Sequence, residues 1–169
     1  MHYTSWDRTD RKRPVLLEEA GPRRLAEFTD SGAEVIEHHW RLDVNDQLGA
    51  TATDELGRVY RLAGRLGRDK VLNASLVGRT FTFVNENGGD WIIDDVESRK
   101  VAQFSSRNSG VRRAILEFDG ESVELSEEEI VALSWFARLI LEAKTSAMAI
   151  PMIATLALAT VVAIITFLM

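Results

Sequence analysis

Positions 145–169 have no charged side chain and are apolar except for five hydroxyl residues: Thr145, Ser146, Thr155, Thr160 and Thr166. A helix needs roughly 20 apolar residues to cross the hydrocarbon core of a bilayer, and this stretch is longer. Pro151 lies within its first two turns, where a missing backbone hydrogen bond costs least. The pattern predicts one transmembrane helix over residues 145–169. Four small residues in it are suited to packing against other helices in the membrane: Ala154, Ala157, Ala159 and Ala163.

The charges that flank this span predict its orientation. Arg138 and Lys144 come just before it, more basic residues come earlier, and none follows within the sequence. Basic flanks stay on the cytoplasmic side of a membrane. We therefore expect residues 1–144 in the cytoplasm, as part of a single-pass, tail-anchored membrane protein.

A shorter apolar segment, residues 126–144, precedes the predicted span. Ser126 and Glu129 form a capping box, which predicts the start of a helix. Only three polar residues interrupt the apolar run that follows: Ser134, Arg138 and Glu142. Their spacing of four places them on one narrow stripe, so the rest of the helix surface is apolar and must be buried away from water. Either a surrounding sheet or the lipid headgroup region beside the anchor would bury this surface. The strand-rich sequence favours the sheet.

Short alternating segments separated by turn residues occupy most of the chain before this helix. Strands are expected at residues 34–42, 58–62, 71–77, 79–84, 91–94, 99–105, 111–118 and 123–125. Strands at this spacing, with no helix between them, are typical of an antiparallel sheet or barrel. The segments TDSGAEV, TDELGRVY and DDVESRKVAQF each place an acidic turn before a strand, which we interpret as similar hairpins laid side by side.

The predicted fold class is α+β, mainly β: an antiparallel sheet or barrel around a hydrophobic C-terminal helix, followed by one transmembrane helix. Residues 1–29 are expected to form a polar, largely unstructured N-terminal arm. Residues 30–144 form a β-rich cytoplasmic domain that contains the helix 126–143, and residues 145–169 form the anchor.

Composition excludes several kinds of function. The net charge of −6 lies entirely before residue 145, and an acidic domain repels the phosphate backbone, so nucleic acid is not expected as a partner. The chain has no cysteine, which excludes disulfides, cysteine-based zinc sites and a thiol nucleophile.

No motif for catalysis, metal binding or cofactor binding stands out. His38 and His39 are adjacent, and neighbours on a strand point to opposite faces, so they do not converge on one metal ion. The glycine-containing stretches match neither a P-loop nor a dinucleotide fingerprint, and no serine has a nucleophile-elbow setting. We expect a non-enzymatic protein without a cofactor.

Basic residues are the remaining candidates for a function. They gather in the N-terminal arm and near the end of the strand series: Arg8, Arg11, Lys12, Arg13, Arg23 and Arg24, then Arg107, Arg112 and Arg113. Each Lys or Arg near an anionic membrane surface contributes about 1 kcal/mol of attraction. The candidates for contact with lipid are Arg8, Arg11, Lys12, Arg13, Arg107, Arg112 and Arg113.

The strand series and the apolar helix together resemble the tubby C-terminal-like fold of the LURP-one-related and phospholipid scramblase-like families. The resemblance covers residues 30–144 and includes the segment FTFVNENGGDWIIDDVESRKVAQFSSR. It implies a barrel of antiparallel strands that encloses one hydrophobic helix in a membrane or lipid context, and a barrel that is smaller or incomplete where the strand count falls short of twelve. The region Glu117–Glu121 lacks the alternating acidic calcium loop of the scramblase-like proteins, and their palmitoylated cysteines are absent. The resemblance therefore implies neither calcium binding nor lipid scrambling.

Three functions follow from these observations. The leading one is a tail-anchored protein whose cytoplasmic domain binds a partner protein or lipid at the membrane face. The second is an accessory or structural subunit of a larger membrane complex, held through the small residues of the span. The third is a scramblase-like lipid-handling protein, by analogy alone.

Overall fold

The computed structural model describes residues 1–107, 114–119 and 124–145. The predicted transmembrane segment lies outside these residues from position 146 onward, as do its four candidate packing alanines. Within the described ranges, no helix combines the length and the apolar character needed to cross a membrane.

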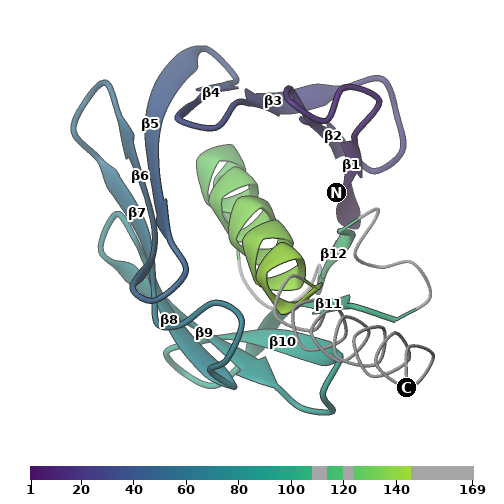
Figure 1. Ribbon diagram of the computed structural model, residues 1–169, viewed down its shortest axis with the longest axis vertical. Helices are drawn as coiled ribbons and strands as arrows, with labels where there is room; N and C mark the ends of the chain where they lie inside the picture. The colour runs from purple at the N-terminus through teal and green to yellow at the C-terminus, as the bar shows by residue number, and fades with distance from the viewer. Residues whose placement is uncertain (108–113, 120–123, 146–169) are drawn as a thin grey trace, which may run out of the picture.

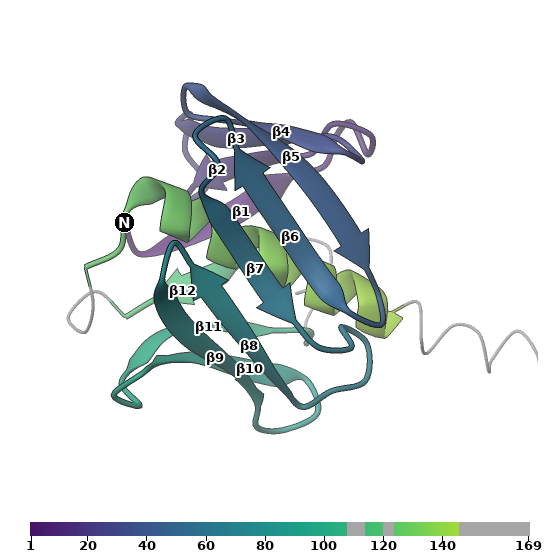
Figure 2. The same ribbon diagram turned by 90° about the vertical axis from the view of Figure 1, so that its left-hand side faces the viewer.

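Twelve antiparallel strands form one closed barrel in which each strand pairs with its neighbours in sequence and β1 pairs with β12. The strands are β1 Tyr3–Asp7, β2 Val15–Glu18, β3 Arg24–Phe28, β4 Gly32–Val35, β5 His38–Asn45, β6 Gly49–Asp54, β7 Val59–Ala63, β8 Val71–Leu76, β9 Arg79–Asn85, β10 Asp90–Asp95, β11 Lys100–Ser105 and β12 Leu116–Phe118. A helix over residues 127–145, the central helix, runs through the barrel (Figures 1 and 2). The mainly β, antiparallel prediction is confirmed.

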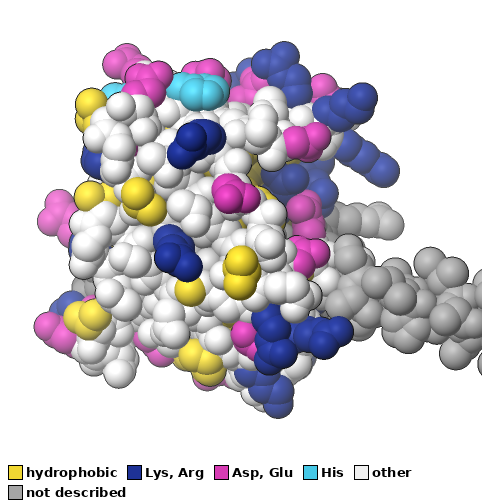
Figure 3. All heavy atoms as spheres, turned by 60° about the vertical axis from the view of Figure 1, so that its left-hand side comes forward, with side chains coloured by type: hydrophobic (Ala, Val, Ile, Leu, Met, Phe, Trp, Pro, Cys, Tyr) yellow, Lys and Arg dark blue, Asp and Glu magenta, His cyan; other side chains and the backbone are white. Residues whose placement is uncertain are grey.

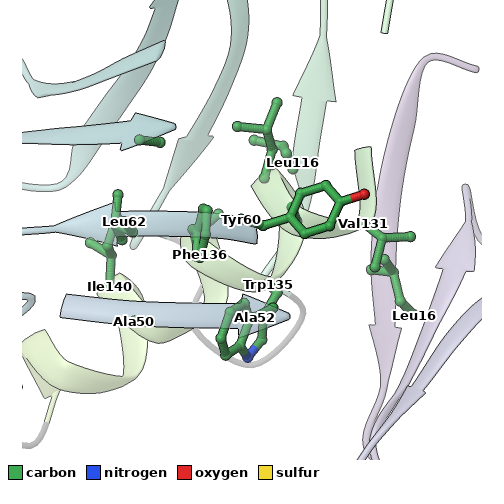
Figure 4. Packing of buried hydrophobic residues seen from close by; sticks show 14 of the residues in the cluster. Leu16, Ala50, Ala52, Tyr60, Leu62, Leu116, Val131, Trp135, Phe136 and Ile140 are labelled. Atoms are coloured by element: carbon green, nitrogen blue, oxygen red, sulfur yellow. The ribbon is translucent and has the colours of Figure 1, made fainter. Parts of the chain in front are cut away.

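The central helix is part of the hydrophobic core. Val131–Ala137, Ile140 and Leu141 are all buried. Figure 4 shows Trp135, Phe136 and Ile140 among inward-pointing side chains of several strands. Phe136 meets Phe83 edge to face with the ring centroids 6.4 Å apart, and Trp135 lies 6.2 Å from Phe28. Of the two placements left open by the sequence, the helix inside the sheet is the correct one.

The prediction of a largely unstructured N-terminal arm is wrong, because residues 1–29 supply β1, β2 and β3. These strands are only four or five residues long, and charged side chains on their outer face hide the alternation of buried positions. Without them the barrel could not close, since β1 pairs with both β2 and β12.

β1 lies against the polar stripe of the central helix. The hydroxyls of Thr4 and Ser134 are 2.8 Å apart. One turn further along the helix, the Arg138 guanidinium lies 4.7 Å from the ring centroid of Trp6. Beyond it, Arg8 forms an ion pair of 2.7 Å with Glu142. Two alternate residues of β1 and the residue that follows the strand thus contact helix residues spaced four apart, so each polar side chain of the stripe has a partner.

β6 was missed by the sequence analysis because its segment, GATATD, has few bulky side chains. Ala50 and Ala52 point inward, where the barrel needs small residues around the helix. Gly49 opens the strand with φ +110°, and an added Cβ there would lie 1.9 Å from the carbonyl oxygen of Leu62. Only glycine fits this close approach of β6 to β7.

Three other strand predictions need correction. The single strand expected over residues 34–42 is two strands, because the chain reverses at Ile36, which is exposed and has a positive φ. Of residues 111–118, β12 covers only the last three, and residues 111–113 lie outside the described ranges. Glu124 and Leu125 are not in a strand, and residue 123 lies outside the described ranges.

Two of the similar hairpins inferred from the sequence share one turn geometry. Asp54 accepts hydrogen bonds from the backbone N–H groups of residues 56 and 58 and from the Arg58 guanidinium. Asp95 accepts the same three bonds from residues 97 and 99. Burial alone would raise the pKa of the Asp54 carboxyl, but the hydrogen bonds and charge of Arg58 outweigh it and lower the pKa. These aspartates are structural anchors of their turns.

Candidate membrane-facing end of the barrel

Strands in this barrel alternate in direction, so every second loop lies at the same end. One end carries the loops at residues 8–14, 29–31, 46–48, 64–70 and 86–89, together with Arg107. The last described turn of the central helix reaches the same end, because Lys144 Nζ donates to the Gly88 carbonyl at 3.0 Å. We call this the basic end.

The two ends carry opposite charge. Nine Lys and Arg residues lie at the basic end: Arg8, Arg11, Lys12, Arg13, Arg65, Arg68, Lys70, Arg107 and Lys144. Five acidic residues of the same loops accompany them: Asp10, Asp30, Asp46, Asp69 and Glu86. Three further carboxylates, Glu27, Asp90 and Glu142, form ion pairs with basic residues of this end. At the opposite end, the described loops carry Arg23, Arg58 and Arg99, and these loops together with the first turn of the central helix carry nine carboxylates: Glu19, Glu37, Glu55, Glu97, Asp119, Glu124, Glu127, Glu128 and Glu129. Figure 3 shows Lys and Arg side chains gathered along the right-hand edge of the face it presents.

Backbone hydrogen bonds tie the loops of the basic end together. Leu66 N–H donates to the Asp46 carbonyl at 3.1 Å, which joins the loop after β7 to the loop after β5. Asn85 N–H donates to the Lys70 carbonyl at 2.8 Å, and Ser106 N–H donates to the Gly89 carbonyl at 2.9 Å. These hydrogen-bonded loops form one connected rim at the basic end of the barrel, and the rim holds the basic side chains of these loops.

Lys144 sits where the central helix meets this rim. Its ammonium lies 4.7 Å from the ring centroid of Trp91, which is a cation–π contact. Burial and, to a smaller extent, the nearby charge of Lys70 lower the pKa of Lys144. Anionic groups brought to this rim would favour the charged form of Lys144.

The structure separates the predicted lipid candidates into three groups. Arg8, Arg13 and Arg107 lie at the basic end but form ion pairs with Glu142, Glu27 and Asp90. Arg11 and Lys12 are exposed in the loop between β1 and β2. Arg112 and Arg113 lie outside the described residues.

Two other basic residues of the N-terminal segment lie elsewhere. Arg23 and Arg24 are at the opposite end, where Arg23 pairs with Glu18 and Glu127. The structure therefore divides the basic residues of the expected arm between the two ends of the barrel.

Arg65, Arg68 and Lys70, in the loop between β7 and β8, were not among the residues predicted from the sequence to contact lipid. They are separated by many residues from the other basic clusters, and only the order of the strands brings them to the same end. Counting strands would have revealed this, because alternate loops of an up-and-down barrel share an end. The undetected strands before residue 30 and at β6 prevented that count.

The outer wall of β10, β11 and β12 bears a cleft of about 350 Å³. Asp90 and Arg107 line it and pair with each other at 3.2 Å, and Gln103 donates to Glu117 at 2.7 Å. Among the described residues, no group of three or more His, Asp or Glu side chains is placed to hold a metal ion. His39 instead lies 2.9 Å from Glu34 across the β4–β5 hairpin.

No family model, curated protein or solved structure matches this chain.

Proposed function

We propose that this protein is a non-enzymatic, membrane-anchored domain whose barrel faces the cytoplasmic leaflet with its basic end and binds lipid or a partner protein there. One observation carries the proposal. The central helix reaches residue 145 at the basic end, directly before the segment whose sequence predicts a transmembrane span. The end of the barrel nearest the predicted anchor is thus also the end suited to anionic lipid.

The energetics favour this orientation over the reverse. Each Lys or Arg close to an anionic leaflet contributes about 1 kcal/mol, and the effect falls off within about a Debye length, near 8 Å. The carboxylates at the opposite end would be repelled by the same surface. They therefore point away from the bilayer and are accessible to a protein partner.

The interior of the barrel suits a binding domain. Trp40, Trp91, Phe81 and Phe136 are among the largest fully buried side chains of one continuous core around the central helix. In this proposal the recognition surfaces lie on the outside, and the filled barrel holds them rigidly. Membership of the tubby-like families is part of the proposal, on the resemblance in sequence pattern alone.

The orientation can be tested with single-cysteine probes, because the chain has no cysteine of its own. The exposed residues Gln47, at the basic end, and Leu56, at the opposite end, are replaced by Cys and labelled with a fluorophore in the full chain. The labelled proteins are placed in nanodiscs of phosphatidylcholine, alone or mixed with phosphatidylserine. Lipids that carry a headgroup spin label then quench any probe close to the surface.

We expect quenching of the Gln47→Cys probe, stronger with phosphatidylserine, and little quenching of the Leu56→Cys probe. Replacing Arg65, Arg68 and Lys70 together with Gln should remove the dependence on phosphatidylserine. Equal quenching at both ends would contradict the orientation, and failure of the chain to enter nanodiscs would contradict the anchor.

The second candidate function, an accessory subunit of a larger membrane complex, rests on the small residues of the predicted span. Ala154→Leu together with Ala157→Leu should then dissociate a complex on native gels, whereas Leu156→Ala should not. Unchanged migration of the Ala154→Leu/Ala157→Leu variant would rule out this candidate function.

A further inference from the structure

Exposed hydrophobic residues gather at the end of the barrel opposite the basic end. Of the nine large hydrophobic residues that are exposed in the described ranges, six lie in or next to the turns of this end: Met1, Ile36, Leu56, Val59, Val77 and Val96. The turns at residues 36–37, 55–58, 77–78 and 96–99 each carry one of them. Figure 3 shows hydrophobic and acidic side chains along the left-hand edge of the face it presents, across from the Lys and Arg side chains.

Turn geometry does not account for two of these residues. Ile36 and Val77 each open a two-residue hairpin turn with a positive φ, of 56° and 49°. Asparagine or glycine is favoured at such positions, and a β-branched side chain is strained there. The two side chains are 47% and 52% exposed, so burial in the core does not offset the strain. Strained residues of this kind concentrate at functional sites.

Three of the exposed residues lie together: Leu56, Val59 and Val77. We call them the tip patch. The backbone N–H of Val77 donates to the Val59 carbonyl at 3.1 Å, which joins the turn after β8 to the start of β7. Leu56 lies in the turn that leads into Val59 and is 73% exposed. Isolated exposed hydrophobic residues are ordinary, but neighbouring ones rimmed by polar residues mark interaction sites.

The free charge beside the tip patch is negative. The basic side chains of Arg58 and Arg79 are already paired with carboxylates of this end. Glu55 precedes Leu56 in its turn, and the Glu124 carbonyl accepts a hydrogen bond of 3.1 Å from Arg79 at the start of β9. The side chains of Glu55 and Glu124 form no hydrogen bond or ion pair with another described residue. Both carboxylates are therefore available to a cation from outside the chain.

We propose that the tip patch binds a basic, amphipathic segment of a partner protein, in which Lys or Arg side chains flank apolar ones. The apolar side chains of the segment pack on Leu56, Val59 and Val77, and its cations pair with Glu55 and Glu124. This inference rests on the protein-binding part of the proposed function and deepens it, because it names the surface and the chemistry of the partner.

Charge complementarity selects this partner over two other occupants of an exposed apolar surface. A second copy of the chain would bring the same carboxylates against each other. An anionic leaflet would be repelled by these carboxylates, and the predicted anchor follows the central helix at the other end of the barrel. A segment that places cations beside apolar side chains matches both the tip patch and its border.

Binding of a designed peptide tests the proposal. The full chain is placed in nanodiscs of phosphatidylcholine, whose surface carries no net charge, and empty nanodiscs serve as the blank. The probe is a fluorescent peptide of leucine and lysine arranged as an amphipathic helix, and its matched control replaces every leucine by serine. Fluorescence anisotropy should show binding of the leucine–lysine peptide above the blank and binding of the serine–lysine peptide that is about tenfold weaker or absent. No binding above the blank, or equal binding of both peptides, would overturn the proposal.

Variants of the chain locate the binding. Leu56→Asn/Val77→Asn removes two apolar side chains, and asparagine tolerates a positive φ, so this variant should bind the leucine–lysine peptide about tenfold more weakly without a fall in its thermal unfolding temperature. Leu48→Asn, at a position 69% exposed in a turn of the basic end, is the matched control and should bind as the unaltered chain does. Equal binding by all three chains, or equal losses in both variants, would overturn the proposal.

A charge variant gives a second test that leaves the apolar residues in place. Glu55→Gln/Glu124→Gln keeps the size of both side chains and should weaken binding of the leucine–lysine peptide several-fold, about as expected for two partly exposed ion pairs. Unchanged binding in this variant would overturn the assigned border of the tip patch.

Failure of this inference is distinguishable from failure of the proposed orientation. The peptide measurement does not depend on which end of the barrel faces the leaflet, because orientation is read from the Gln47→Cys and Leu56→Cys probes. Absent quenching of the Gln47→Cys probe together with intact peptide binding would contradict the orientation alone. Strong quenching of the Leu56→Cys probe would make the bilayer the occupant of the tip patch, and a dimer that Leu56→Asn/Val77→Asn dissociates would make a second copy the occupant. Either result would overturn this proposal.

Discussion

The contact between β1 and the central helix leads to a specific prediction about stability. Ser134 Oγ donates its only hydrogen to the Ile130 carbonyl at 2.7 Å, so Thr4 must donate the bond of 2.8 Å that joins the two hydroxyls. Both residues are 0% exposed. Thr4→Val keeps the shape of the side chain and removes the donor, which should lower the free energy of unfolding by about 1 kcal/mol.

The partner substitution should cost more. Ser134→Ala leaves the buried Thr4 hydroxyl without an acceptor, and an orphaned buried group costs about 1–3 kcal/mol. The double variant removes the orphan, so its loss should be smaller than the sum of the two single losses by about 1 kcal/mol.

Urea unfolding of the full chain in non-ionic detergent, followed by tryptophan fluorescence, measures these losses. Trp6 and Trp135 are buried near this contact and report on it. Thr80→Val, on the exposed outer face of β9, is the control and should change the free energy of unfolding little. Additive losses in the double variant would refute the reasoning, because they would mean that the two hydroxyls do not interact.

Three further predictions concern single positions. Gly49→Ala should destabilise the barrel by more than about 2 kcal/mol, because the added Cβ would meet the backbone of β7. Gly57→Ala, where nothing lies within 4 Å of the added Cβ, should cost only about 1 kcal/mol of backbone strain, and thermal unfolding of the two variants compares these losses. The lowered pKa of Asp54 contributes stability that is present above pH of about 4 and lost as the pH falls through the folded-state value, so Asp54→Asn should flatten the acid side of the stability profile; an unchanged profile would contradict the assigned hydrogen bonds. Burial raises the pKa of Tyr60 to about 12, so stability that is present below pH 10 is lost between about pH 10 and 12, and Tyr60→Phe should remove this alkaline loss as measured by circular dichroism.

The sequence predicted those parts of the fold that rest on local patterns. The capping box at Ser126 and Glu129 does mark the start of the central helix: Glu129 N–H donates to Ser126 Oγ at 3.2 Å, and Ser126 N–H donates to the Glu129 carboxylate at 2.9 Å. The apolar circumference of that helix also predicted its burial correctly. Both signals come from residues close together in the chain.

The parts that the sequence analysis missed depend on contacts between distant segments. Thr4 and Trp6 contact Ser134 and Arg138, which lie more than a hundred positions away in the chain. These contacts form only when β1 packs against the central helix. β6 lacks the usual alternation of bulky apolar and polar residues, because its inward-facing residues are alanines that leave space for the central helix. The basic end likewise could not be predicted, since Arg65 joins Arg11 there only through the order of the strands.

One measurement tests the central claim, that a self-contained barrel is held on a membrane by the segment after residue 145. The full chain and the chain ending at residue 145 are expressed in parallel, extracted with alkaline carbonate, and the soluble protein is unfolded thermally. We predict that the full chain stays in the membrane pellet, whereas the shorter chain is released and unfolds cooperatively. Release of the full chain would contradict the anchor, and retention or aggregation of the shorter chain would contradict the self-contained barrel.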